Sequence, residues 1–262
     1  KDDYILNLGI EDSNINDYFI QAKNLETIKK LVKYGGDVKK TNDKGSFFHN
    51  LIWEHGYRYQ SKNDEEILEI IDYLKNQNFN LDQKNGRGVT PLFYACELGL
   101  IKAVKKLLDY GCSQFVSDGN SFYNDTCFTV ALRRGKLNIC RLLIDRMEDI
   151  NSKDVFDTRL ILSIDHNNPE MVEYILEKKN IDVNKFYGEN TPLSLLIDKS
   201  WFNLELIKKL IDKGANVNLR DLDGSTPLHW ACYKSKYKIA KLLINRGANR
   251  LVRDDEGDIH KI

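Results

Sequence analysis

Proline, methionine and paired cysteines are scarce in this chain, and long apolar stretches are missing. Its 262 residues include 4 prolines, 2 methionines and 5 cysteines, and no two cysteines form a C-x-x-C pair. This odd, scattered set indicates neither a disulfide framework nor a zinc site, and reduced thiols fit a cytoplasmic protein. Charged residues interrupt every apolar stretch well before the roughly 20 residues that a membrane helix requires, so we expect no membrane span.

An excess of either charge is also absent. The 39 Lys and Arg residues balance 39 Asp and Glu residues, and the sequence pI is about 7.1. Non-specific nucleic-acid binding draws its free energy from neutralising phosphates with a basic excess, so we expect no nucleic-acid partner, although a local basic patch is compatible with this balance. With 42% hydrophobic and 30% charged residues, the chain has the composition of a folded, well-solvated protein.

The first residues lack the marks of a secretory signal. The sequence starts at Lys1 rather than at a methionine, and residues 1–10 contain neither a basic start nor an apolar stretch. We therefore expect the sequence to be a fragment or a processed chain.

Three of the four prolines stand in the same tripeptide, Thr-Pro-Leu, which begins at Thr90, Thr191 and Thr226. A threonine side chain caps a helix N-terminus, and proline suits the first helical position because its missing N–H leaves no donor unsatisfied. Each tripeptide therefore predicts a helix start. Weaker copies that keep the hydroxyl begin at Ser46, Thr126 and Thr158. The six starts taken together are 44, 36, 32, 33 and 35 residues apart, and a period of about 33 residues is typical of a stacked repeat array.

A second series in the same register marks the helix ends. At four places, apolar residues spaced three and four apart precede a glycine, which predicts an amphipathic helix that ends in a left-handed turn. Asn78 and Met147 take the glycine position in two further copies. Asparagine tolerates a left-handed backbone, whereas Met147 would be strained or would need a different turn. The four glycines are Gly35, Gly111, Gly214 and Gly247.

Residues 221–249 carry these signals in their most complete form. They contain Thr-Pro-Leu-His-Trp-Ala from Thr226 to Ala231, then a second apolar pattern and Gly-Ala-Asn from Gly247. This pattern resembles the ankyrin repeat, whose signature is T-P-L-H-x-A followed by a second helix and G-A-D/N-V-N. The resemblance implies an all-α ankyrin-repeat solenoid of helix-turn-helix units with short β-hairpin fingers, in a single domain over residues 1–262. We expect seven repeats and part of an eighth, at 12–40, 41–84, 85–120, 121–152, 153–185, 186–220, 221–252 and 253–262.

Three stretches depart from the repeat pattern. Residues 56–64 add a stretch between the helices of the second repeat, and residues 116–124 lengthen the finger before the fourth. Residues 199–202 lengthen the helix turn of the sixth repeat. Insertions in repeat proteins lie in exposed loops, where they either mark a binding face or reflect neutral variation in loop length, and the sequence leaves both readings open.

No residue pattern indicates catalysis, a cofactor or a metal. The family resemblance implies that His49 and His229, at the fourth position of T-P-L-H, form hydrogen bonds within the turns. His49 and His55 are six residues apart, which does not bring both imidazoles to one helix face for a metal. Residues 221–224 place a glycine wrongly for a calcium loop, and residues 86–88 are too short for a dinucleotide fingerprint. We therefore expect a protein that is not an enzyme.

The positive functional prediction concerns protein recognition. Stacked ankyrin-like repeats present a concave surface made of the finger tips and the exposed side of each first helix, and aromatic residues and arginine dominate many interfaces. The strongest candidates are Phe122 and Tyr123 on the lengthened finger, beside Arg133 and Arg134 on the next helix. The alternative is that the aromatic side chains pack against neighbouring fingers. The predicted partner-binding residues are Trp53, Arg87, Phe122, Tyr123, Asp125, Arg133, Arg134, Tyr187, Asp223, Tyr233 and Lys234.

Taken together, these patterns predict a non-catalytic module that binds a partner protein on the concave face, as a cytoplasmic monomer without cofactor or metal. Two alternatives remain. The abundance of Lys, Asn and Ile is typical of AT-rich genomes, which fits a pathogen effector or a toxin-neutralising ankyrin protein. The chain is otherwise the recognition part of a larger multidomain enzyme, whose catalytic domain lies outside residues 1–262.

Overall fold

The chain divides into two compact units, Lys1–Leu143 (unit 1) and Ile144–Ile262 (unit 2), and each is described by itself. The computed structural model describes residues 15, 18–19, 22, 24–39, 41–42, 45–59, 64–115, 126–146, 153–178, 181–186, 188–199, 204–255 and 257.

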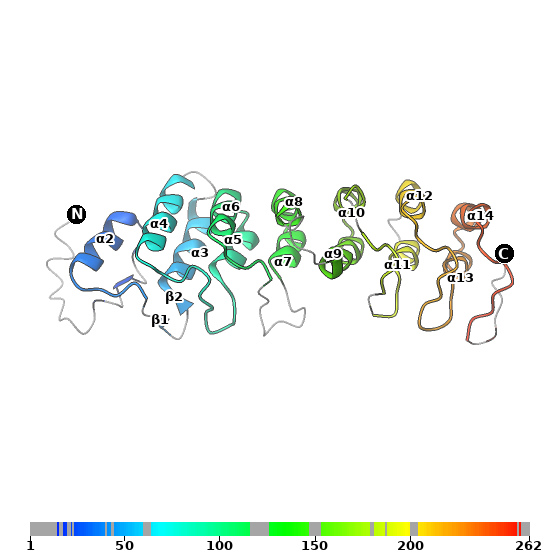
Figure 1. Cartoon of the computed structure of the whole chain (residues 1–262), viewed down its shortest axis with the longest axis horizontal. Coiled ribbons are helices and arrows are strands. Elements are labelled where there is room, and N and C mark those ends of the chain that lie inside the picture. The colour runs from blue at the N-terminus through cyan, green and yellow to red at the C-terminus, as the bar shows by residue number, and fades with distance from the viewer. Residues whose placement is uncertain are drawn as a thin grey trace. The chain divides into compact units, whose positions relative to one another are not determined.

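The described residues of unit 1 form helix pairs and a very short hairpin. Strands β1 (Thr41–Asn42) and β2 (Gly45–Ser46) pair antiparallel. The helices are α2 (Leu25–Lys33), α3 (Phe47–Tyr59), α4 (Asp64–Asn76), α5 (Pro91–Leu98), α6 (Ile101–Asp109), α7 (Cys127–Arg133) and α8 (Leu137–Asp145), the last of which ends just beyond the unit boundary. The first helices of successive pairs, α3, α5 and α7, contact one another in turn, and so do the second helices α2, α4 and α6 (Figure 1).

Unit 2 repeats this arrangement. Its first helices α9, α11 and α13 contact one another in turn, and the second helix α10 contacts α12. The described helices of both units pack in successive pairs, which confirms the prediction of an all-α fold built from ankyrin-like units. The helices of unit 2 are α9 (Lys153–Asp165), α10 (Pro169–Leu176), α11 (Pro192–Asp198), α12 (Leu204–Asp212), α13 (Pro227–Tyr233) and α14 (Tyr237–Asn245).

Most of the predicted helix starts are confirmed. Thr90, Thr126, Thr191 and Thr226 each have an extended backbone and immediately precede a helix. The hydroxyl oxygen of Thr191 accepts the backbone N–H of Ser194 at 3.1 Å, and the Ser194 hydroxyl oxygen accepts the N–H of Thr191 at 2.9 Å. This reciprocal capping satisfies two backbone donors that a helix start otherwise leaves unpaired.

Two local predictions were wrong. Thr158 does not start a helix, because α9 already begins at Lys153 and runs through it. Residues 153–165 contain no glycine or proline, so nothing in this stretch interrupts the helical backbone. Residues 56–59 belong to α3 rather than to a loop, so the extra stretch of the second repeat begins as an extension of its first helix.

The helix ends follow the predicted left-handed turns. Gly35, Gly111, Gly214 and Gly247 have φ angles of 91°, 85°, 99° and 89°. Asn78 takes the same role with φ 55°, as expected for a residue whose short polar side chain tolerates this region. Met147 lies outside the described residues.

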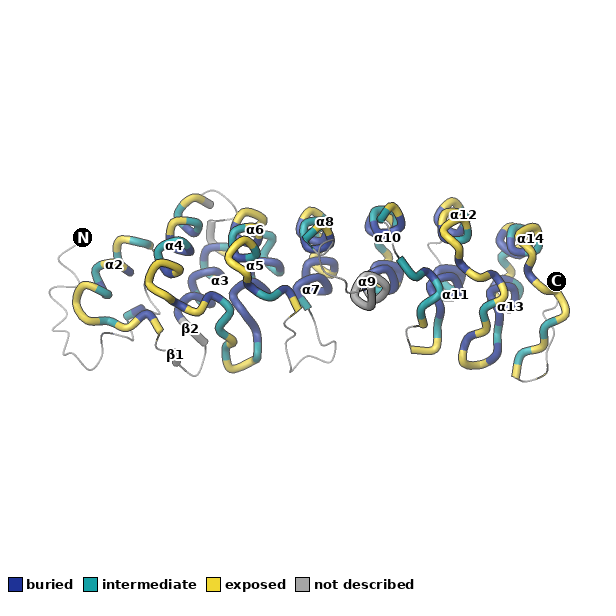
Figure 2. Tube along the Cα trace, in the orientation of Figure 1, coloured by how far each residue is buried: buried dark blue, intermediate teal, exposed yellow. Residues whose placement is uncertain are grey.

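The core follows the stripes predicted by the sequence. In unit 1, Val104 and Leu107 of α6 are fully buried, and in unit 2 Ile239 and Leu243 of α14 are fully buried. Figure 2 shows buried residues where the two helices of a pair face each other and exposed residues on the outer turns of the second helices. Each such buried aliphatic side chain contributes on the order of 2 kcal/mol by leaving water. The helix pairs therefore depend on their neighbours to remove these stripes from solvent.

Candidate functional site: the finger and first-helix surface

The loop that joins a second helix to the next first helix is called a finger. In two of the described fingers, one side chain makes an equivalent set of hydrogen bonds. In unit 1, the side-chain oxygen of Asn85 accepts the backbone N–H groups of Arg87 and Val89 at 2.9 and 3.1 Å. The Asn85 amide also donates to the Tyr94 hydroxyl on α5 at 3.2 Å. One side chain thus closes the finger tip and fastens it to the helix that follows.

In unit 2, a carboxylate takes the same position. Asp221 Oδ1 accepts the backbone N–H groups of Asp223 and Ser225 at 3.2 and 2.8 Å. Its Oδ2 accepts the indole N–H of Trp230 on α13 at 2.6 Å. Because Asp221 is buried and its acceptors are occupied, the finger tip is fixed before any partner arrives.

The histidines of the turn motif hold fingers and helix starts, as the resemblance implied. His49 Nε2 donates to the Val89 carbonyl at 2.9 Å, so α3 is fastened to the finger that precedes α5. His229 Nδ1 accepts the backbone N–H of Thr226 at 3.1 Å and its hydroxyl at 2.8 Å. Both imidazoles are buried, which assigns them to the scaffold rather than to a solvent-facing site.

An aromatic cluster lies on the first helices of unit 1. The Trp53 ring packs against Tyr57, one turn further along α3, at a centroid distance of 5.1 Å. It also meets the edge of Tyr94 on α5 at 5.3 Å. Trp53 remains 36% exposed and Tyr57 66% exposed. Since Tyr94 is also bonded to Asn85, the cluster is continuous with the finger that carries Arg87.

Ion pairs link the ends of successive first helices. In unit 1, Arg134 pairs with Glu97 of the preceding repeat. In unit 2, Lys199 pairs with Asp165 at 2.8 Å, and Lys234 pairs with Asp198 at 2.6 Å. In each pair the cation stands eight residues after the threonine of its own repeat. The acid stands seven residues after the equivalent threonine of the preceding repeat. The carboxylate of Asp198 raises the pKa of Lys234 through their hydrogen bond.

The structure places the predicted partner-binding residues in three groups. Arg87 and Asp223 lie at exposed finger tips, and Trp53, Arg133 and Tyr233 are exposed on first helices, Tyr233 at 79%. Arg134 and Lys234 are committed to the ion pairs just described, and the Lys234 ammonium also lies over the Trp230 and Tyr233 rings at 5.9 and 5.5 Å. Four predicted residues lie outside the described residues: Phe122, Tyr123, Asp125 and Tyr187.

Two of the predicted aromatic residues, Trp53 and Tyr233, contact aromatic side chains on helices. Trp53 does pack on neighbouring aromatic side chains, yet it keeps a face toward solvent. In unit 2, Tyr233 and Trp230 are arranged edge to face, with ring centroids 6.3 Å apart, and Tyr233 stays mostly exposed.

Sequence reasoning missed the residues that hold this surface together. Asn85 and Asp221 both stand five residues before the threonine of Thr-Pro-Leu, and their aromatic partners Tyr94 and Trp230 stand four residues after it. That shared spacing is the signal that identifies both pairs. Tyr57 was missed because it was assigned to a loop rather than to the end of α3.

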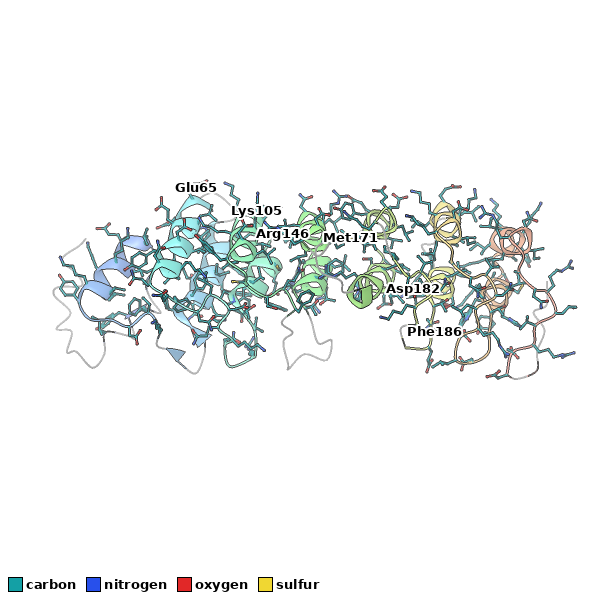
Figure 3. All side chains as sticks on the ribbon, in the orientation of Figure 1. Glu65, Lys105, Arg146, Met171, Asp182 and Phe186 are labelled. Carbon is teal, nitrogen blue, oxygen red and sulfur yellow. The ribbon has the colours of Figure 1, made fainter. Side chains whose placement is uncertain are left out.

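The second helices carry a separate set of ion pairs. Asp72 on α4 accepts from Lys106 Nζ and from the Tyr110 hydroxyl, each at 2.5 Å. Burial acts to raise the pKa of Asp72, but these two hydrogen bonds and the charge of Lys106 outweigh it, so the net shift is downward. In Figure 3, Glu65 and Lys105 project from second helices of unit 1, whereas Phe186 lies on a finger of unit 2.

Metal binding and the Cys112 thiol can be assessed within the described residues. These residues contain no group of three or more His, Cys, Asp or Glu side chains arranged to hold a metal ion. Cys112 is buried, and burial first, then the nearby Asp82 carboxylate, raises its pKa to about 12. None of the described helices combines the length and the hydropathy needed to cross a membrane.

Comparison with known proteins agrees with this geometry. The family model that describes three consecutive copies of the ankyrin repeat matches residues 17–118, 58–154, 116–187 and 160–254. The chain is 27% identical over 215 residues to ankyrin repeat protein L371 of Acanthamoeba polyphaga mimivirus, covering 78% of this chain and 27% of that protein. It is 30% identical over 222 residues to the NAD-dependent deacetylase sir2B of Dictyostelium discoideum, covering 79% of this chain and 26% of that one.

The chain thus spans about a quarter of the length of these two relatives. Among solved structures, the ankyrin repeat domain of Bcl-3 matches with a TM-score of 0.65 and 20% identity, over 81% of this chain and 90% of that domain. That similarity establishes the fold. Because the family model matches most of the sequence, the chain belongs to the ankyrin-repeat family.

Proposed function

We propose that this chain is a non-catalytic module that binds a partner protein through its finger and first-helix surface. The observation that carries the proposal is the aromatic cluster of Trp53, Tyr57 and Tyr94. Its rings are partly exposed, yet packing and the Asn85 bond already fix them. A surface that loses little side-chain entropy on binding gains affinity from each contact. Large aromatic residues of this kind are the usual anchors of protein interfaces.

The proposed contact residues combine this cluster with the residues predicted from the sequence. Arg133 and Tyr233 supply exposed groups, whereas Arg134 and Lys234 contribute mainly by holding adjacent repeats in register through their ion pairs. We place the module in the cytoplasm as a monomer. The proposed partner-binding residues are Trp53, Arg87, Phe122, Tyr123, Asp125, Arg133, Arg134, Tyr187, Asp223, Tyr233 and Lys234.

A second candidate function is recognition within a larger enzyme. It is favoured by the match to the deacetylase sir2B, of which this chain covers 26%. In that case the same surface would present a substrate protein to a catalytic domain outside residues 1–262. The match to a mimivirus ankyrin protein leaves the effector or toxin-neutralising role as a third form of the same binding function.

Affinity capture with the immobilised chain tests the proposal. The wild type is compared with Trp53→Ala/Tyr57→Ala and with Phe122→Ala/Tyr123→Ala. The matched control, Lys102→Ala/Lys105→Ala, changes exposed residues on the second helix α6. Proteins retained from lysate are identified by mass spectrometry, and the affinity of the main one is measured by calorimetry. Circular dichroism melting confirms that each variant is folded.

We expect the two aromatic variants to lose about 2 kcal/mol of binding free energy, which corresponds to roughly 30-fold in Kd, and the α6 control to bind like the wild type. Loss of binding in the α6 control with unchanged binding in both aromatic variants would place the interface on the second helices and refute the proposal. Retention of no specific protein would also contradict it.

A further inference from the structure

The last complete repeat has an unusual charge distribution. From Gly224 to Arg253 the sequence contains no Asp or Glu but seven Lys and Arg residues. The chain as a whole balances 39 cations with 39 acids, so residues 224–253 concentrate positive charge that acids elsewhere in the chain balance. Other second helices of unit 2 are acidic or mixed, as with Glu205 and Asp212 beside two lysines in α12. Helix α14 has Lys238 and Lys241 and no acid.

Four of the seven cations are already engaged. Lys234 and Arg246 pair with acids of the preceding repeat, Asp198 and Asp212. Lys236 and Arg253 donate to backbone carbonyl groups. In the part of the chain that the structure describes, no carboxylate lies within 4.0 Å of the three remaining cations. These three exposed cations are Lys238, Lys241 and Arg250.

Two tyrosines lie beside the unpaired lysines. Helix α13 ends at Tyr233 and α14 begins at Tyr237, so these two residues flank the turn at residues 234–236. They are 79% and 71% exposed. On α14, Tyr237, Lys238 and Lys241 share the face opposite the buried stripe, because residues three and four apart are neighbours on a helix. We call Tyr233, Tyr237, Lys238 and Lys241 the α13–α14 surface.

We propose that the α13–α14 surface is a docking site for an acidic protein segment that carries aromatic or aliphatic side chains. The two ammonium groups would pair with carboxylates of the segment, and the two phenol rings would cover its apolar side chains. Charge complementarity selects the acidic class, because residues 224–253 contain no Asp or Glu that could neutralise Lys238 and Lys241. The tyrosines select a segment with apolar residues, because exposed rings gain most from burial against such groups.

A nucleic acid fits this surface less well. Non-specific binding of a phosphate backbone relies on several cation contacts along the strand. Here α14 offers two unpaired lysines, and the other cations around the α13–α14 turn are committed to acids or carbonyls within the repeat array. The proposal rests on the proposed function and adds to it the chemical class of the partner and the repeat that binds it.

The test measures the fluorescence anisotropy of a labelled peptide, Glu-Asp-Phe-Glu-Glu-Leu-Asp-Glu-Phe-Asp, as the full chain is added at low salt. The same peptide with every Glu replaced by Gln and every Asp by Asn is the neutral probe. A labelled oligothymidylate of equal charge is the nucleic-acid probe. The variants are Lys238→Glu/Lys241→Glu and Tyr233→Ser/Tyr237→Ser. The matched control Lys105→Glu/Lys213→Glu makes the same change in net charge at exposed lysines of other repeats.

We expect each surface variant to weaken binding of the acidic peptide by about tenfold, with the control within about twofold of the wild type. We also expect the neutral peptide to bind weakly and added salt to weaken the acidic complex, because exposed charge pairs are screened. Equal weakening in the control, equal binding of the neutral peptide, or tighter binding of the oligothymidylate would overturn the proposal. Self-association in sedimentation that Lys238→Glu/Lys241→Glu abolishes would assign the surface to a second copy of this chain instead.

This experiment separates the two proposals. If the aromatic variants in unit 1 lose the captured partner but the α13–α14 variants bind the acidic peptide as the wild type does, protein binding stands and the docking site falls. If the α13–α14 variants lose the peptide while the unit 1 variants still bind the captured partner, the docking site stands and the proposed binding through the unit 1 cluster falls.

Discussion

Trp230 and Asp221 are joined by a hydrogen bond of 2.6 Å between the indole N–H and a carboxylate oxygen, across nine residues of the same repeat. The other carboxylate oxygen closes the finger tip by accepting two backbone N–H groups. A finger would otherwise be a loop free to sample many conformations. In unit 1 the uncharged pair Asn85 and Tyr94 does the same. The shape of the proposed binding surface therefore depends on Asp221, Trp230 and Asn85, which are not among the proposed contact residues.

Replacing Asp221 with alanine should destabilise unit 2. The change leaves the Trp230 indole and two backbone N–H groups without their acceptor, and bonds to a charged acceptor contribute about 1.5–3 kcal/mol. We expect the free energy of unfolding, measured by urea titration followed by circular dichroism, to fall by about 2 kcal/mol. Asp223→Ala is the matched control, since its exposed side chain has no such bonds, and it should change stability by less than about 0.5 kcal/mol. Equal losses in both variants would mean that the finger is not held by Asp221.

Gly214→Val should lower stability through the backbone alone. Gly214 has φ +99°, and a Cβ built there meets nothing within 4 Å, so crowding is not the reason. A β-branched residue in the left-handed region costs about 1 kcal/mol or more. The matched variant Gly214→Asn should cost less, because Asn78 ends α4 in the same kind of turn with φ 55°. Thermal melting distinguishes the two, and an identical melting midpoint for valine and asparagine would show that the strain is not conformational.

The contribution of Asp72 should depend on pH in one direction. Its pKa is lowered from 3.8 in the folded chain, so its pairing stabilises the fold fully above that value and is lost as the pH falls through the folded pKa. Because the pair is partly exposed, Asp72→Asn should cost only about 0.5 kcal/mol near neutral pH. Urea titrations of both proteins between about pH 6 and pH 3 should show this difference shrinking on acidification. A difference that grows as the pH falls would contradict the assigned shift.

Lys236 should act as a cap for α11. Its ammonium donates to the carbonyl groups of Ile197 and Lys199 at the end of that helix, and burial lowers its pKa. Lys236→Met keeps the stem but removes the donors, and we expect a loss of about 1–2 kcal/mol in urea unfolding. Lys238→Met, two residues away on the exposed side of α14, is the control and should leave stability unchanged. A small effect at both positions would show that water replaces the ammonium without cost.

Much of the fold was predictable because its signals are local. A threonine before Pro91, Pro192 and Pro227 marks a helix start through hydrogen bonds within three residues, and glycine marks a helix end through its own backbone angles. The same locality explains the error at Thr158. There the hydroxyl is present, but no proline follows it and no glycine precedes it, and the backbone remains helical from Lys153 onward.

The candidate surface was less predictable, because pairing across repeats decides which of its charges are available. Arg134 and Lys234 resemble Lys238 in the sequence, yet Arg134 and Lys234 each meet an acid of the preceding repeat. The sequence places these residues in the correct part of the repeat. It does not show which of them is already neutralised.

The sequence alone determined the family, the helix pairs and the turns, because caps and apolar stripes act within one repeat. Only the tertiary structure decided that Arg134 binds Glu97, 37 residues away, and that Asp221 and Asn85 lock their fingers to aromatic residues of the next helix. The physical reason is that stacking brings together side chains one whole repeat apart, at distances that depend on how the helices pack.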